Sequence, residues 1–228
     1  MHEPLTVDIW SDVVCPWCYI GKRKFEAALA QLDGDVPVTV RYHAYQLDPT
    51  APPGVAEPVT EAYAKKFGGP DAARQIIERV TGVAADVGLE FRMDIALRAN
   101  TLLAHRLLWL AAQPDSPAPQ PVVKERLLRA YFTEGRDIGD PDTLAELLAE
   151  VGFDGDTVRA WLDTDAGAAD VAADIAQAGD YGITAVPTFV VNGTWGIPGA
   201  QDADTFVNVL RRLHAKVSGD ESDAAAEP

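Results

Sequence analysis

Strand-like sequence is confined to the two ends of this chain, and a long helical stretch separates them. Near the start, Leu5, Val7 and Ile9 alternate with other residues, which predicts a strand with these side chains on one face. A second alternating run covers residues 36–45, and another predicted strand at 187–191 follows only near the far end. One sheet therefore has to be assembled from both ends of the chain, with the intervening residues packed around it.

The first two strands are joined by a predicted helix. Apolar residues from Cys15 onward recur at three- and four-residue spacing, and the pattern ends near Asp33. Pro16 would occupy the first turn, where its missing N–H has no cost. The order strand, helix, strand favours a βαβ unit with a parallel pair of strands.

The middle of the chain is predicted to be helical. Residues 48–58 are rich in proline and are expected to form a loop that ends the sheet pattern. Apolar spacing and helix-ending residues then predict helices over 59–67, 71–87, 99–112, 122–133, 141–151, 156–162 and 166–181.

The sheet pattern returns near the other end of the chain. After the strand at 187–191, Asn192 and Gly193 predict a hairpin to a second arm at 194–197. A final helix is expected over 202–217, because its apolar residues form one stripe. Residues 218–228 are acidic and lack large apolar side chains, so a disordered tail is expected there.

Length and charge exclude several classes of protein. With 228 residues, the chain fits one enlarged domain or two small ones. Its net charge of −16 disfavours nucleic acid and anionic membranes as partners, and its apolar runs are too short to span a bilayer. No secretory signal is visible in the first residues, so a cytoplasmic location is expected.

The chain has two cysteines, and both belong to the sequence Cys15-Pro16-Trp17-Cys18. A disulfide between them would close too small a loop to stabilise a fold of this size. A zinc site would need about four ligands, and no second cysteine pair exists to join the scattered histidines, so no metal is expected. A reduced, closely spaced pair in the cytosol favours catalytic thiol chemistry.

The position of the pair at a strand–helix junction suggests different roles for the two thiols. The N-terminus of a helix stabilises a thiolate through its free N–H groups and its positive dipole end. Cys15 would occupy this end and act as the attacking nucleophile. Cys18 would lie one turn deeper and resolve a mixed disulfide formed at Cys15. Asp12 is a candidate for modulating the proton of either thiol, although a turn-forming carboxylate is an equal alternative.

Several blocks of sequence carry a family resemblance that spans about residues 5–212. They are Asp12-Val13-Val14-Cys15-Pro16-Trp17-Cys18-Tyr19-Ile20-Gly21-Lys22, Asn100-Thr101 with Ala104-His105-Arg106-Leu107, Ala130-Tyr131-Phe132-Thr133-Glu134-Gly135, and Ile183-Thr184-Ala185-Val186-Pro187-Thr188-Phe189 with Gly199-Ala200-Gln201. In this order they resemble the DsbA-like branch of the thioredoxin superfamily and, more narrowly, its FrnE-type cytosolic members.

The resemblance implies an α/β thioredoxin fold with a large all-helical insertion. The thioredoxin-fold domain would be discontinuous, formed by residues 5–47 and 183–217, with residues 48–182 as the helical insert. Pro187 would be a cis-proline that faces the two cysteines and serves the catalytic site with them. A trans-proline that opens an edge strand is the alternative.

The resemblance also suggests residues that would contact a substrate. Val186 would lend backbone groups to an extended substrate segment. Pro16 is a further candidate for substrate binding, and Trp17 is expected to be exposed, where it could serve as a platform for the substrate. His105 and Asn100 are further candidates from the helical insert. For His105 a buried interhelical histidine is an equal alternative, and for Asn100 the alternative is an N-cap before Thr101.

Together these features predict a thiol–disulfide oxidoreductase or disulfide isomerase that acts through a mixed disulfide on protein or small-molecule thiols and disulfides. No bound cofactor is expected, and glutathione is a candidate co-substrate. One alternative on the same scaffold is a glutathione-dependent isomerase of the 2-hydroxychromene-2-carboxylate type, although such relatives typically carry serine where this chain has Cys15. A non-catalytic chaperone or binding module is the other alternative. The sequence leaves the direction of the reaction and the oligomeric state open.

Overall fold

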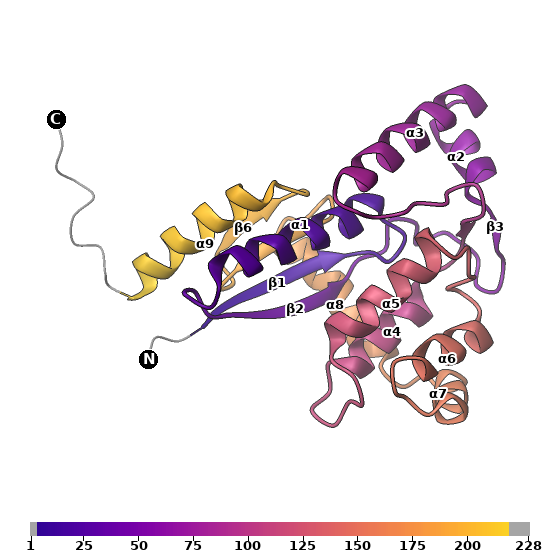
Figure 1. Cartoon of the computed structure of the whole chain (residues 1–228). Coiled ribbons are helices and arrows are strands. Elements are labelled where there is room, and N and C mark those ends of the chain that lie inside the picture. Colours follow the sequence, from indigo (N-terminus) through magenta and orange to yellow (C-terminus); the bar gives the residue numbers. More distant parts are fainter. Residues whose placement is uncertain (1–3, 219–228) are drawn as a thin grey trace.

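A computed structural model describes residues 4–218 of the chain. A four-stranded sheet in the order β2-β1-β5-β6 lies at its centre (Figure 1). Its strands are β1 Leu5–Ser11, β2 Val38–Ala44, β5 Thr188–Val191 and β6 Trp195–Pro198. β1 and β2 pair in parallel, and the other neighbouring pairs are antiparallel. The predicted α/β class and the assembly of one sheet from both ends of the chain are confirmed.

Helices α1 (Pro16–Leu32) and α9 (Ala203–Ser218) cover one face of this sheet (Figure 1). Alternate residues of β1 face them, and Phe25, Phe189 and Phe206 fill the space between the layers with their rings about 5 Å apart. Burial of these apolar side chains holds the sheet and its two helices together. Apart from Ser218, the predicted acidic tail lies outside the described residues.

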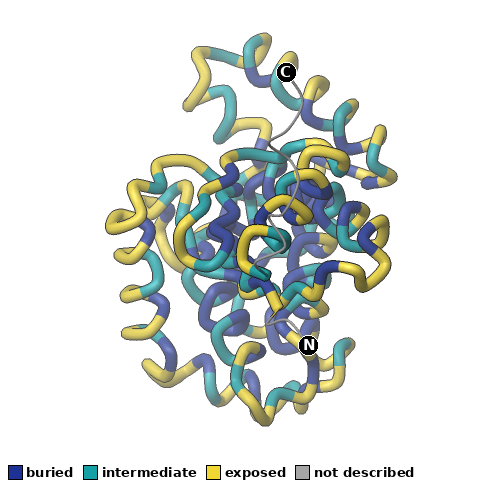
Figure 2. The backbone as a smooth tube through the Cα atoms, turned by 90° about the vertical axis from the view of Figure 1, so that its left-hand side faces the viewer, coloured by how far each residue is buried: buried dark blue, intermediate teal, exposed yellow. Residues whose placement is uncertain are grey.

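The residues between β2 and β5 form the helical insert. Its helices are α2 Val59–Phe67, α3 Pro70–Asp86, α4 Leu102–Ala111, α5 Gln120–Phe132, α6 Pro141–Ala149, α7 Gly155–Leu162 and α8 Ala168–Asp180. They enclose an apolar core of their own, which also takes in residues at the start of α1. Figure 2 shows buried backbone running through the centre of the molecule, with exposed segments at its periphery. No helix among residues 4–218 is both long and apolar enough to span a membrane.

The structure differs from the sequence-based prediction in the loop after β2. Two short strands, β3 (Glu57–Pro58) and β4 (Leu97–Arg98), pair antiparallel and form a second, two-stranded sheet. The sequence predicted only a proline-rich loop at residues 48–58, because Pro58 disfavours a strand. A two-residue edge strand can accommodate this proline, and the pairing anchors the loop beside α2.

The helical insert docks on the free edge of the central sheet. At this edge the side chain of Gln120 in α5 accepts a hydrogen bond from the Tyr42 N–H at 2.8 Å and donates one to the Tyr42 carbonyl at 2.9 Å. Asp174 of α8 accepts a hydrogen bond from the Ala44 N–H at 2.8 Å. These side chains pair the backbone groups that an edge strand would otherwise leave unsatisfied.

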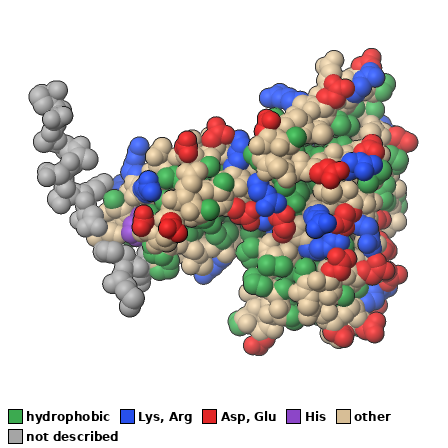
Figure 3. All heavy atoms as spheres, viewed as in Figure 1, with side chains coloured by type: hydrophobic (Ala, Val, Ile, Leu, Met, Phe, Trp, Pro, Cys, Tyr) green, Lys and Arg blue, Asp and Glu red, His purple; other side chains and the backbone are tan. Residues whose placement is uncertain are grey.

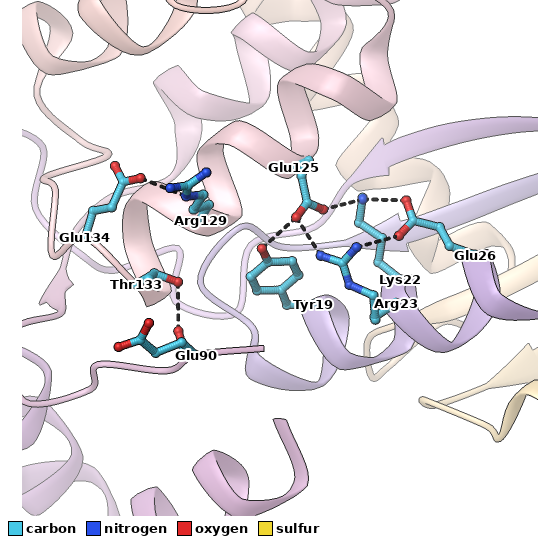
Figure 4. A network of polar contacts seen from close by, with 9 residues as sticks. All are labelled: Tyr19, Lys22, Arg23, Glu26, Glu90, Glu125, Arg129, Thr133 and Glu134. Atoms are coloured by element: carbon cyan, nitrogen blue, oxygen red, sulfur yellow. Dashed lines mark hydrogen bonds and ion pairs between the residues drawn. The ribbon is translucent and has the colours of Figure 1, made fainter. Parts of the chain in front are cut away.

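A polar network joins the insert to α1 (Figure 4). The carboxylate of Glu125 in α5 accepts hydrogen bonds from Tyr19 and Arg23 of α1, each at 2.7 Å, and it also pairs with Lys22. Lys22 and Arg23 both pair with Glu26 as well. The network fixes α5 against the N-terminal half of α1, where both cysteines lie.

Candidate active site

Cys15 directly precedes α1. Its extended backbone makes it the N-cap of the helix, and Pro16 follows in the first turn, as predicted. The carbonyl of Cys15 accepts hydrogen bonds from the N–H groups of Cys18 at 3.0 Å and Tyr19 at 3.3 Å. The side chain of Cys15 forms no capping hydrogen bond with the first turn, so its thiol lies at the N-terminus of the helix without a bond to the first N–H groups.

The segment before β5 faces this thiol. The Val186–Pro187 peptide bond is cis, as the resemblance implied. The Cys15 Sγ lies 3.6 Å from the carbonyl oxygen of Val186, to which the thiol donates. Pro187 packs closely on α1, since a Cβ placed on Gly21 would lie 3.0 Å from the Pro187 Cγ. Two segments far apart in sequence therefore meet at Cys15.

Cys18 lies in the interior behind Cys15. Both cysteines are free thiols, and each side chain is 3 % exposed. Burial raises the pKa of Cys18 well above its ordinary value, and its hydrogen bond with Cys15 raises the pKa further. The charge of Lys124 and the backbone of Asp12 act in the opposite direction. Burial therefore favours the protonated form of Cys18, and the charge of Lys124 favours its thiolate.

Asp12 lies fully buried beneath the two cysteines. Its carboxylate accepts hydrogen bonds from the Val13 and Leu47 N–H groups, both at 2.8 Å. The Nε2 of His105 lies 3.0 Å from Asp12 Oδ1 and 3.1 Å from the carbonyl oxygen of Tyr45. Because both of these partners are acceptors, Nε2 carries a hydrogen in this arrangement. Asp12 thus links the turn before Cys15 to the helical insert.

Lys124 is a residue of this site that the sequence analysis missed. It belongs to α5, is 1 % exposed, and places its Nζ 3.5 Å from the Ser11 carbonyl and 5.6 Å from the centre of the Tyr42 ring. Burial lowers the pKa of Lys124 to about 8, although the charges of Cys18 and Asp12 oppose this shift. A signal was present in the sequence, since Lys124 shares the helical stripe of Leu127, Leu128 and Tyr131.

A cleft of about 460 Å³ opens beside the thiols. Its wall includes Val14, the residue before Cys15, together with Tyr63 of α2 and Tyr131 of α5. Burial and the charge of Cys15 raise the pKa of Tyr63 to about 12. A larger cleft of about 620 Å³ lies between β2, α4 and α8. Neither cysteine lines either cleft, but the wall of the smaller one includes Val14, the residue before Cys15, which makes it the candidate for a thiol substrate.

The candidate substrate-binding residues Val186, Pro16 and Trp17 differ in how far each is buried. Val186 lies at the thiol of Cys15. Pro16 is buried. Trp17 is half-buried against the core of the insert, so its expected exposure is corrected; the docking of the insert, which sequence reasoning could not place, covers part of it.

The two predicted residues of the insert are held by contacts within the protein, and their contact with a substrate stays a prediction. His105 is 2 % exposed and its Nε2 lies 3.0 Å from Asp12 Oδ1, the buried position that the alternative describes. The amide of Asn100 donates to the Ala51 carbonyl at 2.7 Å and accepts from the Leu102 N–H at 2.9 Å. Both polar groups of Asn100 thus support the backbone at the start of α4, close to the capping alternative.

The described residues contain no group of three or more histidine, cysteine, aspartate or glutamate side chains that could hold a metal ion. The groups gathered at the site are instead two thiols, a carboxylate, an imidazole and an ammonium. Such a set can stabilise thiolates and exchange protons beside a sulfur–sulfur bond.

Comparison with known proteins agrees with this geometry. Residues 6–211 match the family model of the DSBA-like thioredoxin domain. A probable DsbA oxidoreductase from Streptomyces coelicolor is 32 % identical, with a TM-score of 0.83 over 98 % of this chain and 94 % of that one. The predicted thioredoxin fold with a helical insertion is confirmed.

Two more distant solved structures share the fold. A 2-hydroxychromene-2-carboxylate isomerase is 16 % identical, with a TM-score of 0.68 over 95 % of this chain and all of that one (100 %). The cytosolic disulfide reductase DsbM from Pseudomonas aeruginosa, solved with glutathione, is 20 % identical, with a TM-score of 0.59 over 94 % of this chain and 98 % of that one. At these identities the similarity concerns the fold.

Proposed function

Because the chain belongs to the DSBA-like thioredoxin domain family, we propose that it is a thiol–disulfide oxidoreductase whose reaction passes through a mixed disulfide at Cys15. The observation that carries this proposal is the asymmetry of the two thiols. Cys15 caps α1 and faces the Val186 carbonyl, whereas Cys18 lies behind it with a raised pKa. The first thiol is placed to attack and the second to resolve.

In the reducing direction, the thiolate of Cys15 attacks one sulfur of a substrate disulfide. A bond forms between Cys15 Sγ and that sulfur, and the other substrate sulfur leaves as a thiolate. Cys18 then attacks Cys15 Sγ, which forms the enzyme disulfide and releases the second substrate thiolate. Two electrons pass from the enzyme dithiol to the substrate, and the oxidising direction reverses each step.

The substrate would lie across Cys15 between the Val186 segment and the cleft beside Tyr63 and Tyr131. Val186 and Pro187 would present backbone to an extended thiol or disulfide substrate, either a protein or a small molecule. Charges at the cleft are largely paired, because Arg98 binds Asp48 at 2.7 Å and Glu57 at 2.8 Å. Figure 3 shows acidic and basic side chains interspersed on one face of the molecule, a pattern that does not favour nucleic acid.

The proposal is tested by reduction of insulin with a thiol donor. The Cys15→Ser variant should lose the activity, and the Cys18→Ser variant should accumulate a mixed disulfide with the substrate, because nothing resolves it. Undiminished activity in Cys15→Ser would refute the proposal and favour a binding module that works without its thiols. The redox potential then sets the direction, with values above ~−200 mV suggesting an oxidant or isomerase and values near ~−270 mV a reductase.

Glutathione is proposed as a co-substrate, in a cytoplasmic setting. The fold shared with the glutathione-bound reductase and with the isomerase supports this idea. The thiol of Cys15 argues against an isomerase that works without net redox change. Calorimetry with reduced glutathione separates the two cases: the isomerase alternative requires saturable binding and turnover of a small cyclic substrate, and an absence of binding eliminates it.

A further inference from the structure

We propose that Lys124, a residue of the helical insert, supplies the positive charge that stabilises the thiolate of Cys18 and so controls the step that resolves the mixed disulfide. The inference rests on the proposed function for the identity of that step. It assigns Lys124 as a positioning residue, since it acts on the sulfur of Cys18 and does not itself contact a substrate.

Lys124 is buried without an acidic partner among residues 4–218. Among the described residues, no carboxylate forms an ion pair with Lys124, whose Nζ reaches only the Ser11 carbonyl and the Tyr42 ring. Lys22 provides the contrast, because it is 4 % exposed yet pairs with both Glu26 and Glu125. A buried ammonium without a carboxylate partner is costly and is not maintained for stability alone.

Titratable groups from several other elements face Lys124. The cysteines and Lys22 belong to the start of α1, Asp12 to the turn after β1, and Tyr42 to β2. Of these, Cys18 heads the interactions that favour the charged form of Lys124, followed by Asp12 and Cys15. Reciprocally, the charge of Lys124 lowers the pKa of Cys18 against the effect of burial. Lys124 therefore faces the resolving thiol together with the buried carboxylate of Asp12, with which it forms no ion pair.

The surroundings of Lys124 keep this charge in place. Glu125, the next residue of α5, is held by Tyr19 and Arg23 on the outer side of α1 (Figure 4). With Glu125 fixed there, Lys124 turns into the core at the end of β1. The buried hydroxyl of Ser11 has no hydrogen-bond partner among the described residues, so this end of the strand is polar inside an otherwise apolar core.

The chemistry follows from this arrangement. In the resolving step, Cys18 loses its proton and its sulfur electron pair forms a bond to Cys15 Sγ. The bond between Cys15 Sγ and the substrate sulfur breaks, and the leaving substrate thiolate takes up the proton. Lys124 remains an ammonium throughout and lowers the free energy of the transient Cys18 thiolate. Above a pH of about 8, Lys124 loses its proton and this stabilisation disappears.

The experiment uses the full chain and an aromatic disulfide that releases a coloured thiolate. Attack by Cys15 releases one equivalent, and resolution by Cys18 releases a second, so the two steps are followed separately. We expect Lys124→Met to slow the second release at neutral pH by at least about tenfold, the effect of about one unit in the pKa of Cys18. Lys124→Arg keeps the charge and should restore the rate to within about threefold.

Lys216→Met is the matched control. It makes the same change of charge, but Lys216 lies near the end of α9 beside Trp195 and should leave both releases unchanged. If Lys124→Met folds and releases the second equivalent within about twofold of the unmodified chain, the proposal is wrong. This result would leave the proposed function intact, because loss of the first release in Cys15→Ser is measured independently.

The pH profile of the unmodified chain provides a test that needs no stable variant. The rate of the second release should rise with pH and then flatten near pH 8, where Lys124 loses its charge. In Lys124→Met it should keep rising about tenfold per pH unit through this range, because only Cys18 titrates. A profile of the unmodified chain that rises without flattening through pH 8 overturns the proposal.

Discussion

Gly21 in α1 packs directly against Pro187, and its replacement by alanine tests how tightly the site is assembled. A Cβ at this position would lie 3.0 Å from the Pro187 Cγ and 3.3 Å from the Ala200 Cβ. Gly82 in α3 is the matched position, since it is also helical but exposed, with no atom within 4 Å of an added Cβ. The two substitutions share their effect on the helix and differ in what the new methyl group meets.

The magnitudes follow from this difference. Glycine to alanine inside a helix stabilises by roughly 1 kcal/mol, so Gly82→Ala should be more stable than the unmodified chain by up to that amount. At Gly21 the same gain is offset by overpacking, which costs about 1–3 kcal/mol. Gly21→Ala should therefore be less stable than Gly82→Ala by about 1–3 kcal/mol. The methyl group would also push Pro187 from the thiols, and displacement of this kind lowers catalytic efficiency by about tenfold or more.

Urea unfolding followed by circular dichroism measures the first difference, and insulin reduction measures the second. We expect Gly82→Ala to keep the full activity. If Gly21→Ala proves as stable and as active as Gly82→Ala, the contact between α1 and Pro187 is looser than the structure shows, and the reasoning fails.

Two further predictions concern the docking of the insert. Burial opposes a charge on His43, but its hydrogen bonds to Asp174 and Asp8 outweigh burial and raise its pKa from 6.5 to about 9. The resulting stabilisation, roughly 3 kcal/mol, is present below pH ~6.5 and is lost as the pH rises through 9. In urea unfolding, His43→Gln should therefore be less stable than the unmodified chain at pH 6, with most of the difference gone at pH 10; a constant difference contradicts the assignment. Gln120→Leu should cost about 1–3 kcal/mol by the same measurement, because it leaves both buried backbone groups of Tyr42 unpaired, and an unchanged unfolding midpoint contradicts this.

Much of the fold could be predicted because its signals are local. Predicted ends of the helices and of the four central strands lie within three residues of the observed ones, and the bounds of α2 agree in full. Glycine and proline mark these ends, as at Gly68 after α2. The hairpin between β5 and β6 follows from Asn192 and Gly193, whose positive φ angles of 47° and 63° suit a tight turn.

The site could be predicted only where its residues are neighbours in sequence or belong to a specific motif. Cys15, Cys18 and the cis-proline at Pro187 are of this kind. The contact of His105 with Asp12 joins positions 93 apart, and that of Lys124 with Ser11 joins positions 113 apart. Such pairs depend on how the insert docks, and the periodicity of a single helix holds no information on its partner.

The helical insert therefore contributes residues to the site itself. The motif supplies both thiols at the start of α1 and the turn before it supplies Asp12, but the imidazole of His105 and the ammonium of Lys124 come from α4 and α5, and the cleft wall includes a tyrosine of α2. A cysteine pair at a helix start has the same bond chemistry in any thioredoxin fold. What differs between such folds is the free energy of each thiolate, and here the buried ammonium of Lys124 on the insert contributes to it. A change in the docking of α5 on α1 should then alter the redox behaviour without altering either cysteine.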